Sequence, residues 1–170
     1  DGRSWQTAYL TIQEAINDTD AAVLPVYIAD GVYEECIVMK SGRKLFGGFE
    51  GYGGAEETSL NQRNWRKNIT IIDATELPSP NHVVYMESLT NTVLDGLMIT
   101  GGNASTGVTD AVPENRGGGI YMAFCDKSNL VRNCSISHNE SIVEGGNLYC
   151  LSSETVFENC LIMRGESSLR

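Results

Sequence analysis

The sequence predicts an all-β fold in which the chain is wound into a solenoid of parallel strands, with a short capping helix at its N-terminal end. Three observations predict it: 18 glycines in 170 residues, two sets of short strand-like segments that recur along the chain, and a helix-start signal before the first of them. Short β-rich runs separated by Gly and Asn are typical of stacked strands. We therefore expect one domain over residues 1–170, or the N-terminal segment of a longer domain.

The first set of recurring segments consists of residues 91–102, 128–139 and 154–165, which superimpose with steps of 37 and 26 residues. Repeats of unequal length with constant apolar positions are typical of coils whose insertions lie in the turns. The superposition gives three apolar columns: Val93, Leu130 and Val156; Leu97, Cys134 and Cys160; and Ile99, Ile136 and Ile162.

A column of Gly and Asn lies between the apolar positions. It contains Gly96, Asn133 and Asn159, and Gly48 takes the same place when residues 44–49 are aligned with the set. Gly and Asn adopt positive φ more readily than other residues, so the column predicts a repeated corner. Because an Asn amide both donates and accepts hydrogen bonds, we expect a ladder from Asn133 to Asn159 that joins successive coils.

The second set of segments reads apolar, Tyr, apolar. In a strand, the tyrosine then lies on the face opposite its two neighbours. We expect Tyr27, Tyr85, Tyr121 and Tyr149 to form one line along the solenoid. Such a line could be a ligand-binding stripe that stacks on sugar rings, a stack that only stabilises neighbouring strands, or a surface covered by a loop.

The two ends of the predicted solenoid differ. Thr11 and Glu14 have the spacing of a capping box, which predicts a short helix within about residues 11–18 that covers the apolar N-terminal end. No second lid follows the last core segment before Arg170. We therefore expect either a fragment of a longer protein or completion of this end by another chain.

The composition excludes some partners. The formal net charge is −10 and the basic residues are not clustered, so nucleic acid and anionic membranes are unfavourable partners. No apolar run approaches the ~20 residues of a membrane span. Asp1 begins inside a patterned segment, so we expect any targeting sequence to have been removed or to lie upstream.

Several segments together resemble a known group of proteins. Residues 1–5, 11–16, 26–33 and 45–49 resemble the N-terminal part of secreted right-handed parallel β-helix proteins of the pectate-lyase-like superfamily. Residues 118–121 and 136–139 look like the GGxI and FxxN repeats of polymorphic outer-membrane proteins and related surface proteins, although Ile136 stands where Phe is usual. The resemblance implies a right-handed parallel β-helix and a secreted or cell-surface location.

Lyases and hydrolases on the fold that this resemblance implies use clustered acids, with calcium or a basic residue. The candidates here are Asp73, Asp95, Arg132 and Glu158, which share one outward column in the alignment. Neighbouring carboxyl groups could serve as acid and base. The other interpretation, which we favour, is that the column forms cross-strand charge pairs. We expect no cofactor; the sequence has no calcium loop, although a calcium ion is compatible with the fold.

Two long polar loops are predicted, at residues 50–68 and 103–116. Loops of this length often recognise partners in a compact fold, and Trp65 is a candidate ligand-binding residue. The alternative is that Trp65 holds its loop against the coil. Among the Asn-x-Ser/Thr sites, Asn103 is the candidate for glycosylation because it lies in a predicted loop.

The five cysteines contain no CxxC motif, so neither zinc nor a redox motif is predicted. Cys134 and Cys160 face inward one coil apart, close enough for a disulfide, but buried free thiols are favoured. His82 and His138 are expected to have surface or turn roles because neither lies beside a candidate nucleophile in the sequence.

These observations favour an extracellular or cell-surface scaffold with a structural or adhesive role, such as a stalk, matrix or filament element that presents loops. Its expected partners are other surface proteins, polysaccharide, or copies of itself bound through the uncapped C-terminal end. The alternative is a polysaccharide lyase or glycoside hydrolase on the same fold, since a fold alone does not determine function.

Overall fold

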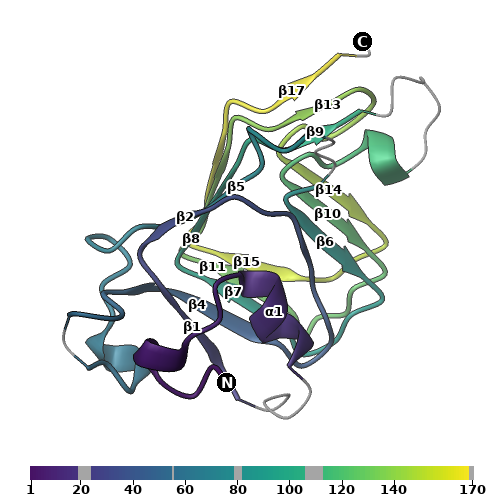
Figure 1. Cartoon of the computed structure of the whole chain (residues 1–170). Coiled ribbons are helices and arrows are strands. Elements are labelled where there is room, and N and C mark those ends of the chain that lie inside the picture. Colours follow the sequence, from purple (N-terminus) through teal and green to yellow (C-terminus); the bar gives the residue numbers. More distant parts are fainter. Residues whose placement is uncertain (19–23, 55, 79–81, 106–112, 169–170) are drawn as a thin grey trace.

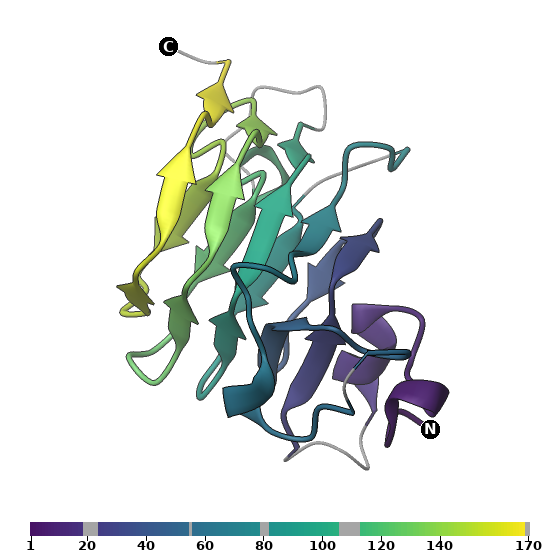
Figure 2. The same cartoon turned by 90° about the vertical axis from the view of Figure 1, so that its left-hand side faces the viewer.

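The computed structural model describes residues 1–18, 24–54, 56–78, 82–105 and 113–168. This part of the chain is predominantly β, and its strands form four parallel sheets, each built from successive passes of the chain. Viewed along the stack, the sheets surround a common interior (Figure 1), and viewed from the side the strands follow one another from the N-terminal to the C-terminal end (Figure 2).

The four sheets are labelled A to D, and the strands of each are given in chain order. Sheet A contains β1 (Val26–Ala29), β4 (Lys44–Phe49), β7 (Val93–Asp95), β11 (Leu130–Arg132) and β15 (Val156–Glu158). Sheet B contains β2 (Gly31–Tyr33), β5 (Thr70–Asp73), β8 (Leu97–Thr100), β12 (Ser135–Ser137) and β16 (Leu161–Met163). Sheet C contains β3 (Ile37–Val38), β6 (Val84–Glu87), β10 (Ile120–Ala123) and β14 (Leu148–Leu151), and sheet D contains β9 (Asn103–Ala104), β13 (Glu140–Ser141) and β17 (Glu166–Ser167).

The helical segments are all short: η1 (Trp5–Thr7), α1 (Ile12–Asn17), η2 (Leu60–Gln62) and η3 (Pro113–Asn115). None of the helices in the described ranges has the length and apolar character needed to cross a bilayer.

Equivalent positions of the first repeat set pair in register, as the alignment predicted. Ile136 pairs with Ile99 on one side and Ile162 on the other, and Leu130 pairs with Val93 and Val156. The interior column of sheet A is, however, one residue further on, at Leu45, Leu94, Val131 and Phe157. Because alternate strand residues face opposite sides, the Val93 column lies on the outer face.

Helix α1 closes the N-terminal end of the interior. Both hydrogen bonds of the predicted capping box are present between Thr11 and Glu14, and Ile12 and Ile16 are buried in the core. The helix lies across the end of the stack in Figure 1. It ends at Asn17, since Asp18 has extended backbone angles.

An insertion after β4 shifts the alignment of the second pass. Strand β4 does not turn at Gly48 but continues to Phe49, which pairs with Ala29. Leu45 pairs with Leu94, so Gly47 rather than Gly48 lies opposite Gly96. The expectation that Gly48 is in register with Gly96 is therefore wrong by one residue, because residues 50–69 replace the corner at this point.

The predicted line of four tyrosines is wrong at one position. Tyr85, Tyr121 and Tyr149 pair in register in sheet C, but Tyr27 lies in sheet A. Its place in sheet C is taken by Val38 of β3, which pairs with Tyr85. An apolar-Tyr-apolar pattern describes any alternating strand and does not specify which sheet the strand joins.

The two predicted loops contain regular structure. Residues 50–68 include η2, and residues 103–116 begin with β9 and end with η3; residue 55 and residues 106–112 lie outside the described part. Asn103 is thus half-buried in a strand beside Glu140 rather than in a loop.

One interior column offers a matched test of the stack. Ile136 is 0% exposed and Ile162, one strand further on, is 45% exposed. We expect Ile136→Ala to lower the free energy of unfolding by about 2–5 kcal/mol, because it leaves a cavity. Ile162→Ala should cost about 1 kcal/mol or less, since its side chain is half in water. Urea denaturation followed by circular dichroism measures both, and equal costs would contradict the placement of this column.

Candidate functional site

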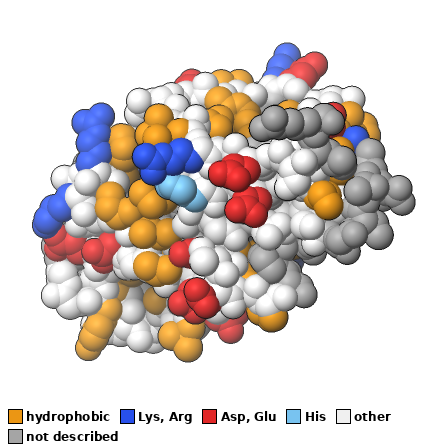
Figure 3. Space-filling view, turned by 90° about the horizontal axis from the view of Figure 1, so that it is seen from above, with side chains coloured by type: hydrophobic (Ala, Val, Ile, Leu, Met, Phe, Trp, Pro, Cys, Tyr) orange, Lys and Arg blue, Asp and Glu red, His pale blue; other side chains and the backbone are white. Residues whose placement is uncertain are grey.

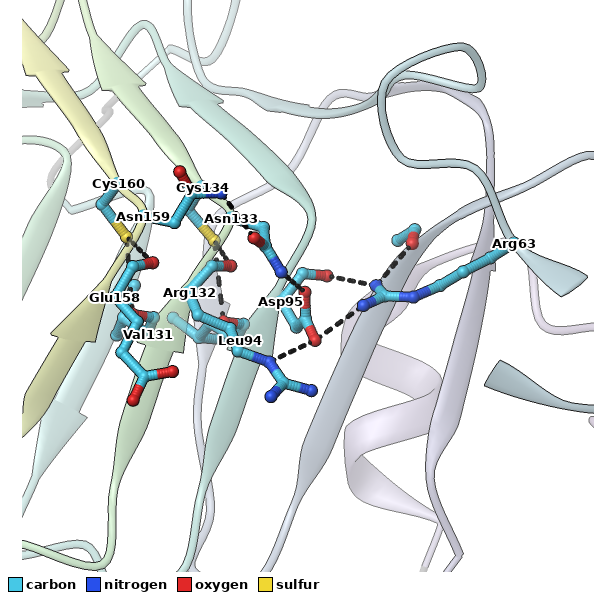
Figure 4. Close-up of polar contacts among 11 residues, drawn as sticks. Arg63, Leu94, Asp95, Val131, Arg132, Asn133, Cys134, Glu158, Asn159 and Cys160 are labelled. Atoms are coloured by element: carbon cyan, nitrogen blue, oxygen red, sulfur yellow. Dashed lines mark hydrogen bonds and ion pairs between the residues drawn. The ribbon is translucent and has the colours of Figure 1, made fainter. Parts of the chain in front are cut away.

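Asp95 is the centre of a charged cluster on the outer face of sheet A (Figure 4). Its side chain is fully buried, and its Oδ2 lies 2.7 Å from Arg63 Nη2 and 2.7 Å from Arg132 Nε. Arg132 comes from the neighbouring strand, where it pairs in register with Asp95. Arg63 comes from the insertion between β4 and β5. The cluster therefore ties the insertion to the stack.

A ladder of side-chain amides continues from Asp95 along the corner. Asn133 Nδ2 donates to Asp95 Oδ1 at 2.8 Å, and Asn159 Nδ2 donates to Asn133 Oδ1 at 2.7 Å. The corner residues Gly96, Asn133 and Asn159 have φ of 75°, 53° and 51°, and Gly48 has φ of 101°. At Asn133 and Asn159, a left-handed corner is thus combined with a hydrogen bond to the preceding strand level.

The change from glycine to asparagine along the corner follows the insertion. A Cβ at Gly48 would lie 2.5 Å from the Trp65 Cα, and one at Gly96 would lie 2.9 Å from the Trp65 Cβ. Only glycine allows the insertion to approach so closely, and the asparagines take over at the next two corners. The backbone and Cβ of Trp65 therefore lie directly against the stack, and Arg66 lies 4.7 Å above the centre of its ring.

The other two predicted catalytic residues lie outside the cluster. Asp73 is in sheet B opposite Thr100, where its Oδ1 accepts hydrogen bonds from the backbone N and the hydroxyl of Thr75. The prediction that Asp73 and Asp95 share one outward column is thus wrong. In the pass that contains the insertion, β4 is the strand of sheet A and β5 is the strand of sheet B, so Asp73 of β5 cannot lie opposite Asp95. The residue opposite Asp95 is Phe46 of β4. Glu158 pairs in register with Arg132, but its carboxylate points away from the cluster (Figure 4) and forms no ion pair with any described residue.

The pKa of Asp95 reflects its partners. Burial acts to raise this pKa, but hydrogen bonds from Arg63, Asn133 and Arg132 outweigh it and the pKa is lowered. Both carboxylate oxygens accept hydrogen bonds in this arrangement. A carboxylate held in this way is a weak base, so the contacts of Asp95 favour a structural role over proton transfer.

The three tyrosines of sheet C form a stack on the outer face. The rings of Tyr85 and Tyr121 are 5.2 Å apart and those of Tyr121 and Tyr149 are 5.7 Å apart, both in stacked geometry. His82 packs against Tyr121 at 5.0 Å, and Arg116 lies 5.0 Å above Tyr149. Tyr121 is only 3% exposed, so this stack does not offer an open row of rings. A surface role for His82 is incorrect, because its side chain is buried and its pKa is lowered by burial, although the residue does lie in the connection between β5 and β6.

A small hollow of about 440 Å³ lies between sheets B and D and was not predicted from the sequence. It is lined by His138, Glu140, Arg164, Gly165 and Glu166, and Arg164 Nη1 lies 3.2 Å from His138 Nε2. Glu140 and Glu166 pair in register on β13 and β17. Figure 3 shows a histidine with basic and acidic side chains around it on the face seen from above. One sequence signal could have suggested it: His138 and Arg164 occupy equivalent positions of the 26-residue repeat. Both have positive φ in the structure.

A larger groove of about 870 Å³ lies at the N-terminal end of the stack. It runs between the first residues of the chain, strand β1 and the start of the insertion, which lie next to each other at this end in Figures 1 and 2. Five aromatic residues line it: Trp5, Tyr9, Tyr27, Tyr33 and Tyr52. Sequence reasoning missed this groove because its walls come from segments about 50 residues apart that share no repeat.

The cysteines and acids give no sign of a metal centre. All five cysteines are free thiols, including the inward-facing pair Cys134 and Cys160. Each thiol lies within hydrogen-bond distance of backbone carbonyl oxygens, Cys134 Sγ 3.2 Å from that of Arg132 and Cys160 Sγ 3.4 Å from that of Glu158. The interaction between the two thiols lowers the pKa of Cys160 and raises that of Cys134. Within the described ranges, no three His, Cys, Asp or Glu side chains converge as metal ligands.

Comparison of the chain with protein-family models, with curated proteins and with solved structures gives no significant match. The geometry of the residues is therefore the basis for any functional proposal.

The Asp95 cluster predicts that replacing Asp95 destabilises the protein far more than replacing Glu158, an acid of the same column. Asp95→Ala leaves Arg63 and Arg132 without their common partner, and we expect a loss of about 3–5 kcal/mol in the free energy of unfolding. Glu158→Ala is the matched control and should change the free energy of unfolding by about 0.5 kcal/mol or less. The Glu158 side chain is exposed and forms no ion pair with a described residue. Denaturant titrations at neutral pH measure both changes.

The same cluster predicts a pH dependence. Because the folded state lowers the pKa of Asp95, its stabilisation is present above the ordinary pKa of an aspartate, about 4, and is lost as the pH falls through the lower folded value. The stability difference between the wild type and Asp95→Asn should therefore shrink below about pH 4. A difference that grows on acidification would contradict the assignment.

Proposed function

We propose that this chain is a right-handed parallel β-helix that serves as a secreted or cell-surface scaffold with a structural or adhesive role. The observation that carries the proposal is the Asp95 cluster. Asp95, one of the predicted catalytic acids, is instead buried and paired with Arg63 and Arg132, and through Arg63 it fixes an inserted loop on the stack. Presenting a loop on a rigid wall is what a scaffold or adhesin requires.

The β-helix proposal is supported by the register of the strands. Within each sheet the strands follow one another in the order of successive passes of the chain. One pass visits the four sheets in turn, since β7, β8, β9 and β10 belong to sheets A, B, D and C. The resemblance of residues 118–121 and 136–139 to repeats of polymorphic outer-membrane proteins agrees with a surface location.

The proposed partners are other surface proteins, polysaccharide or copies of the same chain. The final strands of the stack support the last of these. Val156, Leu161, Ile162 and Met163 are 42%, 56%, 45% and 39% exposed on strands whose outer edge pairs with no described strand. Parallel strands can add to such an edge through backbone hydrogen bonds, whether they come from further sequence of the same protein or from a second copy.

A polysaccharide lyase or glycoside hydrolase is the second candidate, and one observation favours it. Glu140 and Glu166 lie on adjacent strands beside the hydrogen-bonded pair His138 and Arg164. In a group of two neighbouring carboxyl groups and a histidine, one member could act as general acid and another as general base. Calcium would be the cofactor to test with this activity.

Incubation with acidic polysaccharides, with and without calcium, separates the two functions. We expect no unsaturated products and no new reducing ends, because the scaffold proposal assigns no catalytic acid or base. Product formation that is lost in Glu140→Gln and kept in Glu158→Gln would establish the enzyme instead.

Self-association through the final strands has its own test. We expect sedimentation velocity to show concentration-dependent assembly, and we expect Ile162→Lys to abolish it by placing a charge on the apolar edge. Phe124→Lys is the control, since Phe124 is 55% exposed but lies in a turn on the side of the stack. A monomer at all concentrations would refute assembly by this chain alone.

A further inference from the structure

The walls of the N-terminal groove are fixed by hydrogen bonds rather than left to adapt. Trp5 Nε1 donates to the Glu57 carbonyl oxygen at 2.9 Å, which joins the N-terminal segment to the insertion. The Glu57 carboxylate is buried and accepts hydrogen bonds from the backbone amides of Glu50 and Gly51 at 2.7 and 3.2 Å. A groove with preformed walls loses little entropy when a ligand binds.

Aromatic rings form much of the lining. Tyr27 stacks on Phe49 with ring centres 4.5 Å apart, and Trp5 lies 5.6 Å from the same phenylalanine. Phe49 is fully buried, so it supports both rings from behind. Tyr52, on the glycine-rich start of the insertion, is 76% exposed. A large exposed aromatic ring at the edge of a preformed groove is available to pack on a ligand.

The polar part of the lining mixes donors and acceptors. Ser4, Gln6, Thr11 and Thr58 add hydroxyl and amide groups to the same lining. A lining that combines aromatic faces with groups that both donate and accept hydrogen bonds matches a ligand of the same character. Sugar rings have this character, because their hydroxyl groups lie around faces of C–H groups.

The charges of the lining disfavour an anionic ligand. Among the described residues that line the groove are the acids Asp18, Glu56 and Glu57 and one cation, Arg3, which pairs with Asp18 at 3.8 Å. Glu56 lies at the surface of the groove, and the whole chain carries a net charge of −10. A uronic acid polymer would meet like charge here.

We propose that this groove binds an uncharged oligosaccharide, with Tyr52 and Trp5 packed on its rings. The volume of about 870 Å³ is suited to a ligand of more than one ring. The proposal deepens the adhesive form of the function proposed above, on which its biological meaning rests, by naming the class of polysaccharide that is bound. The proposed site lies at the N-terminal end, apart from the hollow around Glu140 and Glu166.

The test is titration of the full 170-residue chain with maltotriose, cellotriose, mannotriose and chitotriose, and with trigalacturonate as the acidic counterpart. Calorimetry gives the affinity, and the indole N–H signal of Trp5 in NMR spectra reports binding at this site. We expect at least one uncharged trisaccharide to bind with a Kd below about 1 mM and at least about tenfold more tightly than trigalacturonate.

Variants locate the binding. Tyr52→Ala removes an exposed ring and should weaken binding about tenfold without a change in the thermal unfolding midpoint. Phe124→Ala removes an equally large exposed side chain far from the groove and should leave the affinity unchanged. Glu56→Gln should narrow the difference between the uncharged sugars and trigalacturonate, because it removes a repulsive charge.

Three results would overturn the inference: no uncharged trisaccharide with a Kd below about 1 mM, trigalacturonate bound as tightly as the best of them, or Tyr52→Ala without effect. Any of these leaves the scaffold proposal standing. Cleavage of acidic polysaccharide would refute the scaffold proposal and leave sugar binding in the groove to be judged by its own titration.

Discussion

In-register parallel pairing is the constraint on which the rest of this structure depends. Each strand lies beside the equivalent strand of the pass before it, so from β7 onward a residue of sheets A and B is next to its own counterpart in the adjacent pass. Apolar side chains then form continuous interior columns, and the three tyrosines of sheet C stack ring on ring. The same constraint brings Asn159 next to Asn133, where a mismatch of one residue would break the amide ladder.

The insertion after β4 shows how such a stack acquires an additional feature without losing its register. Residues 50–69 leave the stack and the chain returns in β5, whose Thr70 pairs with Leu97 as if no interruption had occurred. Among the contacts that hold the insertion are the close approach of Trp65 to Gly48 and Gly96, the ion pair of Arg63 with the buried Asp95, and hydrogen bonds from Asn64 and Asn68 to the Gly48 carbonyl oxygen. The Asp95 side chain thus belongs both to the repeat and to the loop. That double role explains why a buried acid is retained on an outer wall, where its loss would leave two arginines without a partner.

Much of the fold was predictable because repetition is visible in the sequence. The columns of Ile99, Ile136 and Ile162 and the corner at Gly96, Asn133 and Asn159 follow from alignment alone. The candidate sites were less predictable. Asp73 and Tyr27 were placed in the wrong sheets, since a short alternating strand fits any sheet equally well. The N-terminal groove had no sequence signal, because Trp5 meets Glu57 only after the chain has completed its first pass.

The sequence by itself determined the recurring strands, the interior column of Ile99, Ile136 and Ile162, the left-handed corners and the capping box of α1, because each of these depends on residues a few positions apart or on a repeated spacing. Tertiary structure decided which sheet each strand joined, which acid was buried with arginines, and where a groove opened. Those outcomes depend on where the insertion leaves the stack and where the chain rejoins it. Contacts between residues far apart in the sequence, such as Trp65 and Gly48, decide this, and no local sequence pattern encodes them.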